Sequence, residues 1–378
     1  MARHAVRSLR SYAFVALAIA AFASASGRAQ TALTSTSIPQ FVYDATWPKQ
    51  PLPKGWIIGN VIGVAIDARD HVWILHRPAT ITEQERGAGF GLKAADCCFP
   101  APPVIEFDPA GNLVQAWGGP GPGYKWVDSE HGLFVDHKDN VWVGNNQGPH
   151  LLKFTRDGKY LLTIGTPGAK PPASNDPAIL GGPAPWVHPR TNELFVADGY
   201  VNRRVIVFDA DTGQYKRMWG AYGGKPDDSV PWKFNPEGTD KPPSRQFQTV
   251  TGVAVSRDDL VYVADRSNNR IQVFRLDGTF VREGFILAKT PRGTVDTLAF
   301  SSDKDQQFLF DADPRDMRVW ILRRSDLQPL GWLGSGGHFG GAFNSPAYLV
   351  TDSNGNLYVG EGQDGKRVQK FAYKGMTR

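Results

Sequence analysis

A two-strand pattern that recurs along the chain sets narrow limits on how this sequence folds. Each copy has an apolar segment, a polar turn of Asp, Asn or Gly, and a second segment of β-branched or aromatic residues. Five clear copies begin at Gly63, Gly132, Trp186, Gly252 and Tyr348, and a more degenerate copy begins at Asp296. Such repeats are typical of folds in which each unit packs against its neighbours to complete a core.

A second hairpin follows the first in the repeating unit. Its first strand begins, for example, at Ile105, Leu152, Val205 and Ile271, and apolar residues alternate with polar ones along it. A period of two indicates strands with one buried face. Four strands in each of six units predict an all-β six-bladed β-propeller with antiparallel sheets.

The two ends of the chain are expected to close the ring. The last blade reaches a strand over residues 370–373 with no clear fourth strand after it, whereas residues 38–47 have a strand pattern before the first full blade. We therefore expect the N-terminal strand to complete the last blade and to cover its open edge.

Residues 1–29 have the three parts of a secretory signal peptide. A positively charged start precedes an uncharged apolar run over 12–23, and small residues follow, with Ala29 or Ala25 before the cleavage position. The run is shorter than the roughly 20 residues that span a bilayer, and an uncleaved anchor is the alternative. We expect residues 30–378 to form a single propeller domain that is periplasmic or secreted, with no membrane span after cleavage.

Composition and charge exclude several classes of protein. The apolar fraction of 41% and the 11 tryptophans exclude a disordered chain, and two cysteines are too few for a disulfide scaffold. The net charge is +5, but four arginines lie within residues 1–29. The basic balance therefore belongs to the export signal and does not indicate a nucleic-acid partner.

The long inserts of the chain are expected to gather on one face of the ring. They replace either the loop between the second and third strands of a blade or the link to the next blade, and both lie at the same end of the axis. The inserts cover residues 78–103, 118–130, 165–183, 220–248 and 334–345. Long loops on a rigid scaffold usually build a binding site, and the alternative is that they only decorate the rim.

An Asp at the end of a second strand recurs with an Arg at the start of the next strand. Antiparallel neighbours bring such residues together, so we expect structural ion pairs that hold the intervening turn. The pairs are Asp198 with Arg204, Asp265 with Arg270, and Asp313 with Arg318.

Two stretches carry a family resemblance. The phrase over residues 261–274 resembles the NHL repeat, and the blade order over about 60–373 resembles the peptidyl-α-hydroxyglycine α-amidating lyases. That family splits a hemiaminal into an amide and glyoxylate at a Zn²⁺ ion held by three His. The resemblance implies a catalytic role for Arg77 and Tyr200, and makes His131 the first metal ligand.

The sequence departs from the family at the other metal positions. The second and third zinc His correspond to Thr251 and Ala347, and a calcium-binding Asp corresponds to Tyr348. Catalytic zinc sites usually need three protein ligands. His131 therefore remains a candidate metal ligand without its two partners, and zinc and calcium both stay open as cofactors.

The three candidate site residues also have roles that need no metal. Arg77 can hold a carboxylate bidentately, and His131 can transfer protons. A cation beside Tyr200 is expected to lower its pKa and make it a base. The alternative is that all three residues support the fold.

Cys97 and Cys98 are adjacent within the 78–103 insert, and the chain has no other cysteine. Export favours oxidation. A vicinal disulfide, a bridge to another chain, free thiols and soft-metal ligation are the options, and the first would stiffen the loop.

These observations lead to one expected function and two alternatives. We expect an exported propeller that binds a small polar or peptide-like ligand on its long-loop face, with lyase-like chemistry through Arg77, His131 and Tyr200. The alternatives are a non-catalytic ligand-binding propeller and a propeller that binds a protein partner.

Overall fold

The computed structural model describes residues 37–90, 95–238 and 240–377. The predicted signal peptide, residues 1–29, lies outside these ranges. The described residues are nearly all β, and their α-helical part is the single turn α1 (Glu83–Arg86). Within the same ranges, no helix has the length and apolar character needed to cross a membrane.

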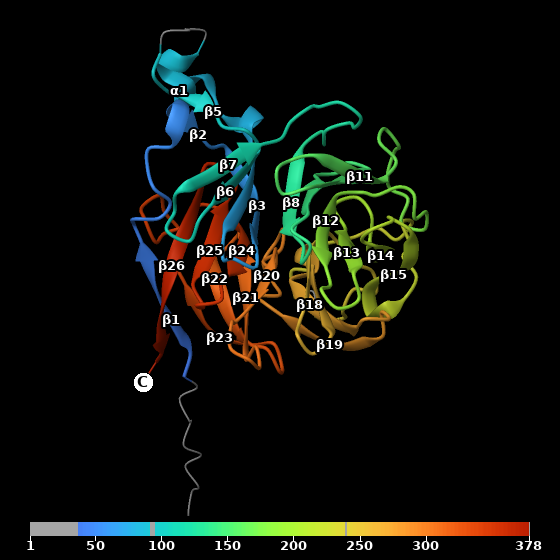
Figure 1. The fold of residues 1–378 in the computed structure, drawn as a ribbon. Coiled ribbons are helices and arrows are strands. Elements are labelled where there is room, and N and C mark those ends of the chain that lie inside the picture. The colour runs from blue at the N-terminus through green and yellow to red at the C-terminus, as the bar shows by residue number, and fades with distance from the viewer. Residues whose placement is uncertain (1–36, 91–94, 239, 378) are drawn as a thin grey trace, which may run out of the picture. The chain divides into compact units, whose positions relative to one another are not determined.

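Six antiparallel four-stranded sheets form the blades (Figure 1). The first strands are β3 (Asn60–Ile66), β8 (Glu130–Val135), β12 (Pro183–Val187), β16 (Val250–Val255), β20 (Leu298–Phe300) and β24 (Pro346–Thr351). The second strands are β4 (Val72–Arg77), β9 (Val141–Asn145), β13 (Glu193–Asp198), β17 (Leu260–Asp265), β21 (Phe308–Asp313) and β25 (Leu357–Glu361).

The outer half of each blade completes the sheet. The third strands are β6 (Val104–Phe107), β10 (His150–Phe154), β14 (Arg204–Asp209), β18 (Arg270–Arg275), β22 (Arg318–Arg323) and β26 (Arg367–Met376). The fourth strands are β7 (Leu113–Trp117), β11 (Tyr160–Gly165), β15 (Tyr215–Trp219), β19 (Phe280–Phe285), β23 (Gln328–Leu333) and β1 (Pro39–Asp44).

The first strands surround a central axis. Each first strand contacts the first strand of the next blade, and β24 of the last blade contacts β3 of the first. This closed circuit confirms the six-bladed β-propeller that the repeat predicts. The blades carry a small parallel pair, β2 (Trp56–Ile57) with β5 (Phe99–Pro100). Short 3₁₀ helices are η1 (Pro53–Gly55), η2 (Pro78–Thr80), η3 (Gly87–Gly89), η4 (Ala221–Gly223) and η5 (Arg266–Asn268).

The two ends of the described chain close the ring as predicted. Strand β1 pairs antiparallel with β26, with Val42 opposite Ala372, and Figure 1 shows β1 in blue beside β26 in red. The Thr377 N–H also donates to the Ile38 carbonyl at 2.8 Å. The N-terminal strand therefore covers the edge that β26 would otherwise expose.

An Asp recurs in the turn between the first and second strands of the early blades, where it joins that turn to a buried tryptophan. In the first blade, the Asp67 carboxylate accepts hydrogen bonds from the turn N–H groups of Arg69 and His71 and from the indole of Trp73 at 3.2 Å. Trp73 has no exposed surface, and burying a side chain of this size stabilises the fold by about 2–3 kcal/mol. The repeated Asp thus fixes the turn and satisfies a buried indole at once.

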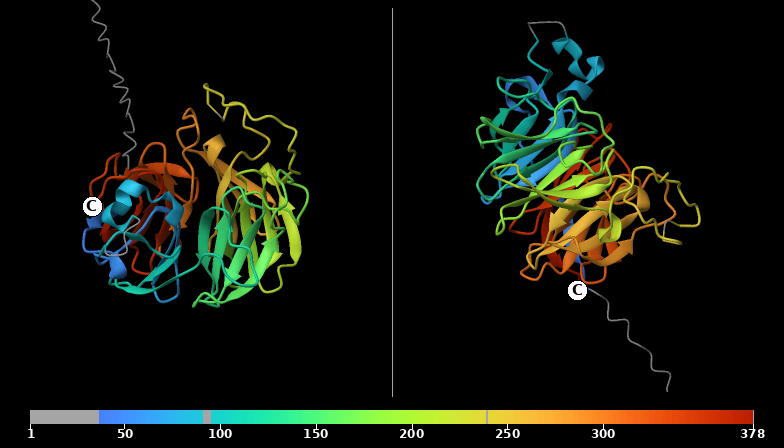
Figure 2. Two further views of the ribbon diagram at one scale, coloured as in Figure 1. Left: turned by 90° about the horizontal axis from the view of Figure 1, so that it is seen from above. Right: turned by 90° about the vertical axis from the view of Figure 1, so that its right-hand side faces the viewer.

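All the long inserts lie at the end of the axis where the first strands begin. The strand order places both the loops after second strands and the links between blades at that end. We call this end the long-loop face and the opposite end the short-turn face. The insert at 220–248, drawn in yellow, extends away from the sheets in both views of Figure 2. A sixth insert, the link over residues 286–297, was not predicted.

Two of the three predicted ion pairs are present. Asp198 with Arg204 and Asp265 with Arg270 lie at 2.8 Å, and all four side chains are fully buried. The predicted pair of Asp313 with Arg318 is wrong. Asp313 accepts from the Trp320 indole and from turn N–H groups, and Arg318 instead pairs with Asp316 at 2.7 Å. The short turn there supplies its own acid, so the arginine turns toward it. A glutamate takes the place of the Asp in the last blade, where Glu361 pairs with Arg367 at 2.6 Å.

A buried histidine anchors the 78–103 insert and makes stability depend on pH. His76 has no exposed surface, its Nδ1 accepts from the Gly59 N–H at 3.1 Å, and its Nε2 donates to the Pro102 carbonyl at 3.0 Å. Burial lowers the pKa of His76 to about 4. The folded state therefore binds fewer protons than the unfolded state between about pH 6.5 and 4, and the free energy of unfolding falls as pH drops through that range.

We expect the lowered pKa of His76 to reduce the free energy of unfolding by about 3 kcal/mol between pH 7 and pH 4. The variant His76→Gln keeps one acceptor and one donor but does not titrate. Urea unfolding at pH 7, 6, 5 and 4 should show a shallower decline for His76→Gln than for the original protein. Parallel declines would contradict the assignment to His76.

Candidate functional site

The polar site lies on the long-loop face, where the first strands begin. His131 is in β8 and Tyr200 is in the turn after β13, and the His131 Nε2 and Tyr200 hydroxyl lie at 3.0 Å. Arg266, in the turn after β17, donates from Nη1 to the Tyr200 hydroxyl at 3.1 Å and to the Asp296 carboxylate at 3.3 Å. Three blades and a link thus contribute to one network, and Arg77 of the first blade lies beside it. We call Arg77, His131, Tyr200, Arg266 and Asp296 the mouth cluster.

Arg77 lies at the end of β4 beside this network. Its Nε donates to the Glu130 carbonyl at 2.9 Å, which fixes the guanidinium next to His131. The side chain is half-buried, and no described residue accepts a hydrogen bond from its two Nη atoms. Arg77 therefore offers a pair of N–H groups of the kind that binds a carboxylate bidentately.

Glycines allow the close approaches that hold the cluster. A Cβ on Gly199 would lie 2.2 Å from the Val250 nitrogen, so the turn that carries Tyr200 can pack directly on β16. Gly293, with φ of +81°, sits against Arg266, where a Cβ would lie 2.0 Å from the Arg266 carbonyl. Only glycine adopts this conformation at that separation, and the link over 286–297 therefore packs directly on Arg266.

Electrostatics keep the imidazole neutral and the phenol protonated. Burial, then the positive charges of Arg77 and Arg266, hold the pKa of His131 well below its usual range. Burial raises the pKa of Tyr200, although Arg266 opposes the shift. The prediction that a cation lowers the pKa of Tyr200 is therefore wrong for the net shift, because desolvation of the phenolate outweighs the arginine.

The hydrogen-bond pattern assigns the protons. Arg266 can only donate to the Tyr200 oxygen, so His131 Nε2 is the acceptor for the Tyr200 hydrogen, and this pairing assigns the neutral imidazole its unprotonated Nε2. The hydrogen of that ring is then on Nδ1, which is buried with no hydrogen-bond partner among the described residues. Tyr200 therefore donates its hydroxyl hydrogen to the neutral imidazole of His131.

The cluster carries more positive than negative charge. Burial raises the pKa of Asp296, and the Arg266 charge opposes that rise. Burial, Asp313 and Asp296 raise the pKa of the neighbouring Asp311 well above its usual range. Within the mouth cluster, the Asp296 carboxylate faces the charges of two arginines, Arg77 and Arg266. The positive charge of the exposed Arg315 also acts on the Asp296 carboxylate and opposes the rise in its pKa.

Sequence reasoning missed Arg266 and Asp296. Arg266 stands 14 residues after Gly252, just as Arg77 stands 14 residues after Gly63, so the two arginines occupy equivalent positions in their repeats. That equivalence was a usable signal, although the repeat at this point is dominated by the ion pair of the neighbouring Asp265 with Arg270. Asp296 lies in a degenerate repeat and gave no such signal.

The donor set does not fit a zinc ion held by three His. Thr251, at the second His position, donates its hydroxyl to the Asp296 carbonyl at 2.6 Å, and Ala347 has no ligand atom. The rings of Tyr348 and His131 pack with their centroids 5.6 Å apart. Tyr348 therefore offers no carboxylate to hold calcium. His131 supplies a single ligand nitrogen, and the positive charges of the two nearby guanidinium groups repel a divalent cation. Neither zinc nor calcium therefore fits these residues.

One other group of metal-ligating side chains was found among the described residues. Asp67, His71 and Glu106 have ligand atoms within 4.8 Å of one another. Arg156 donates to both Asp67 and Glu106, and its guanidinium occupies the space between them. This group is an ion-pair cluster that already has its cation.

Cys97 and Cys98 form a vicinal disulfide in the structure. Gly89 packs against their peptide, where a Cβ would lie 2.7 Å from both the Cys97 carbonyl oxygen and the Cys98 nitrogen. The disulfide therefore lies within a tightly folded part of the 78–103 insert.

Comparison with known proteins agrees with the resemblance found in the residues. The NHL repeat family model matches residues 247–274. Peptidyl-alpha-hydroxyglycine alpha-amidating lyase 1 of Drosophila melanogaster is 24% identical over 364 residues, which cover 89% of this chain and 61% of the lyase. NHL repeat-containing protein 3 of Mus musculus is 28% identical over 251 residues, 63% of this chain and 58% of that protein. The matches thus span at most about three fifths of these relatives.

A solved structure has the same fold. A structural genomics protein from Bacteroides thetaiotaomicron VPI-5482 matches with a TM-score of 0.53 and 13% identity, covering 84% of this chain and 70% of that chain. At this identity the likeness supports the fold alone. The chain therefore carries an NHL repeat within a six-bladed propeller and is similar to amidating lyases at low identity.

Proposed function

We propose that this protein binds a small carboxylate-bearing, peptide-like ligand at the mouth cluster and cleaves it as a lyase without a bound metal. One observation carries the proposal: Arg77 presents two unpaired Nη groups in a cluster where a single carboxylate, Asp296, balances the charges of Arg77 and Arg266. Half-buried guanidinium groups with unmet hydrogen bonds favour an anion. The similarity to the Drosophila lyase suggests a peptidyl-α-hydroxyglycine as the substrate class.

The residues can move one proton through such a substrate. Arg77 holds the carboxylate and brings the α-hydroxyl toward the Tyr200 oxygen. As the C–N bond breaks and the C=O of glyoxylate forms, Tyr200 takes the hydroxyl proton and gives its own proton to the departing amide nitrogen, while the neutral His131 holds the phenol in place. The proton lost by the hydroxyl is thus replaced on the amide nitrogen, so no net proton is consumed. Arg266 stabilises negative charge on the Tyr200 oxygen during transfer.

The expected location also belongs to the proposal. We infer that the segment over residues 1–29 directs export and that the mouth cluster works outside the cytoplasm. N-terminal sequencing of protein recovered from the periplasm or medium tests this, and a chain that still begins at Met1 would contradict it.

The decisive experiment measures turnover and binding together. Chelator-treated protein is given an N-acyl-α-hydroxyglycine and assayed for glyoxylate, and N-acylglycine binding is measured by calorimetry. We expect Arg77→Met to weaken N-acylglycine binding by about 100-fold, as two charge-assisted hydrogen bonds are lost. The control Arg275→Met removes an exposed arginine from β18 and should change neither value.

The loss of the zinc ligands at Thr251 and Ala347 favours a second candidate, a binder without turnover. Binding of N-acylglycine that depends on Arg77, with no release of glyoxylate, would support that candidate and overturn the lyase. Unchanged binding in Arg77→Met would overturn both.

A further inference from the structure

A second concavity lies at the other end of the axis. A cavity of about 470 Å³ is lined by first-strand residues from all six blades and opens among the turns of the short-turn face. Its inner end reaches Thr251 and Tyr348, which lie beneath the mouth cluster. Ligand sites in proteins commonly have volumes of roughly 300–1,000 Å³ with mostly apolar walls.

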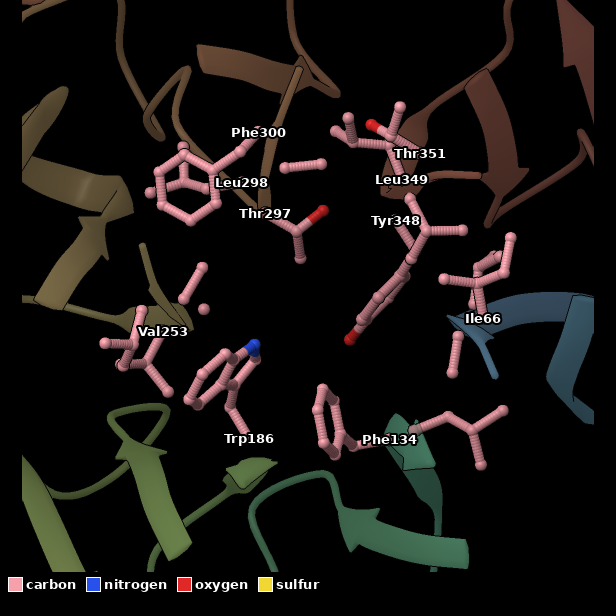
Figure 3. A pocket seen from close by; sticks show the side chains of 18 of the residues that line it. Ile66, Phe134, Trp186, Val253, Thr297, Leu298, Phe300, Tyr348, Leu349 and Thr351 are labelled. Carbon is pink, nitrogen blue, oxygen red and sulfur yellow. The ribbon is translucent and has the colours of Figure 1, made fainter. Parts of the chain in front are cut away.

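The walls of this axial cavity are apolar and partly aromatic. Phe134 and Trp186, from neighbouring blades, lie with ring centroids 5.5 Å apart, and Phe300 lies across the space from them (Figure 3). These three rings and Ile66 are only half-buried although they lie on strands that line the axis. Covering apolar surface of this kind contributes about 25 cal/mol per Å², so a flat apolar molecule gains from entering.

A hydroxyl at the inner end lacks a partner. Tyr348 is 7% exposed, and no described residue forms a hydrogen bond with its OH. Figure 3 shows this hydroxyl directed into the cavity. A buried hydroxyl without a partner costs about 1–3 kcal/mol, and a ligand with one polar group at its leading end would recover part of that cost.

The rim favours a neutral ligand. The Asp70 carboxylate accepts from the Ser353 N–H and hydroxyl, and the Asp352 carboxylate accepts within its own turn. The exposed Arg257 donates to the carbonyls of Ser302 and Asp303. With its acids and this arginine already engaged in hydrogen bonds, the rim offers little attraction to an ion.

We propose that the axial cavity is a binding site for a neutral, flat aromatic molecule whose polar group reaches the Tyr348 hydroxyl. The site is separate from the mouth cluster, because its opening lies on the short-turn face, and Arg257 at its rim already donates to backbone carbonyls. The protein then holds two different ligands at the two ends of one axis.

The test uses 2-naphthol as the probe and 2-methylnaphthalene as its analogue without a hydroxyl, each measured by equilibrium dialysis. We expect saturable 2-naphthol binding at one site. Val253→Phe, which fills the cavity from β16, should weaken it at least tenfold, and Leu298→Phe, from β20, should do the same. The matched control Val114→Phe adds the same ring at an exposed position of β7 and should leave binding unchanged.

A further variant tests the inner end. Tyr348→Phe keeps the ring and should reduce the preference for 2-naphthol over 2-methylnaphthalene about fivefold to tenfold, the loss of one hydrogen bond. Thermal melts show which variants are folded, and the two filling variants provide independent evidence. Lack of saturable binding, equal binding in Val253→Phe and Val114→Phe, or an unchanged preference in Tyr348→Phe would overturn the proposal. Unaltered 2-naphthol binding in Arg77→Met is expected, and a loss there would place the probe at the mouth cluster instead.

Discussion

Arg270→Met is expected to lower the free energy of unfolding by about 3–5 kcal/mol, because it leaves the buried Asp265 carboxylate without its cation. Both side chains are fully buried and lie at 2.8 Å. Arg270 also donates to the Tyr222 hydroxyl and the Gln246 carbonyl, so its removal breaks a network that joins the 220–248 insert to β18. Urea unfolding at pH 7 measures the loss.

The same substitution at Arg318 is the matched control. Arg318 stands opposite Asp313 in the ladder just as Arg270 stands opposite Asp265. Its guanidinium pairs with the partly exposed Asp316 and stacks on Trp320 and Trp332. We expect Arg318→Met to cost only about 1 kcal/mol, as for a partly exposed ion pair with a cation–π contact. Equal losses in the two variants would show that burial of the pair does not set its contribution.

This contrast shows how far the sequence can predict the fold. The alternation of apolar residues and the repeated turns define four strands per blade, and the incomplete last blade predicts that β1 pairs with β26. The same register also brings Asp313 opposite Arg318. It cannot indicate that Asp316 lies nearer, because that depends on how the turn over 314–317 folds.

The candidate site was predictable only in part, for a related reason. Arg77, His131 and Tyr200 came from a family resemblance, and the structure brings His131 and Tyr200 within hydrogen-bond distance. Arg266 and Asp296 join them because the ring closes distant blades around one axis. The axial cavity is set by the sizes of side chains on six separate strands, which no local pattern reports.

The roles of Arg266 in stability and in binding can be separated by a double variant. Arg266→Met removes the positive charge beside Asp296, which is 3% exposed. At pH 8 the carboxylate is left buried and unpaired, and we expect a loss of about 3 kcal/mol in the free energy of unfolding. Because burial already raises the pKa of Asp296, this variant gains protons on folding. The difference in the free energy of unfolding between Arg266→Met and the original protein should therefore shrink as pH falls toward 5.

Adding Asp296→Asn removes the unpaired charge while keeping the shape of the side chain. The double variant Arg266→Met with Asp296→Asn should recover about 2 kcal/mol of stability at pH 8. It should not recover N-acylglycine binding, which we expect to fall about 100-fold in both variants because the second guanidinium of the mouth cluster is gone. Recovery of binding along with stability would mean that Arg266 acts only by neutralising Asp296. Arg77 alone would then hold the carboxylate, and the mouth cluster would contain one anion-binding arginine instead of two.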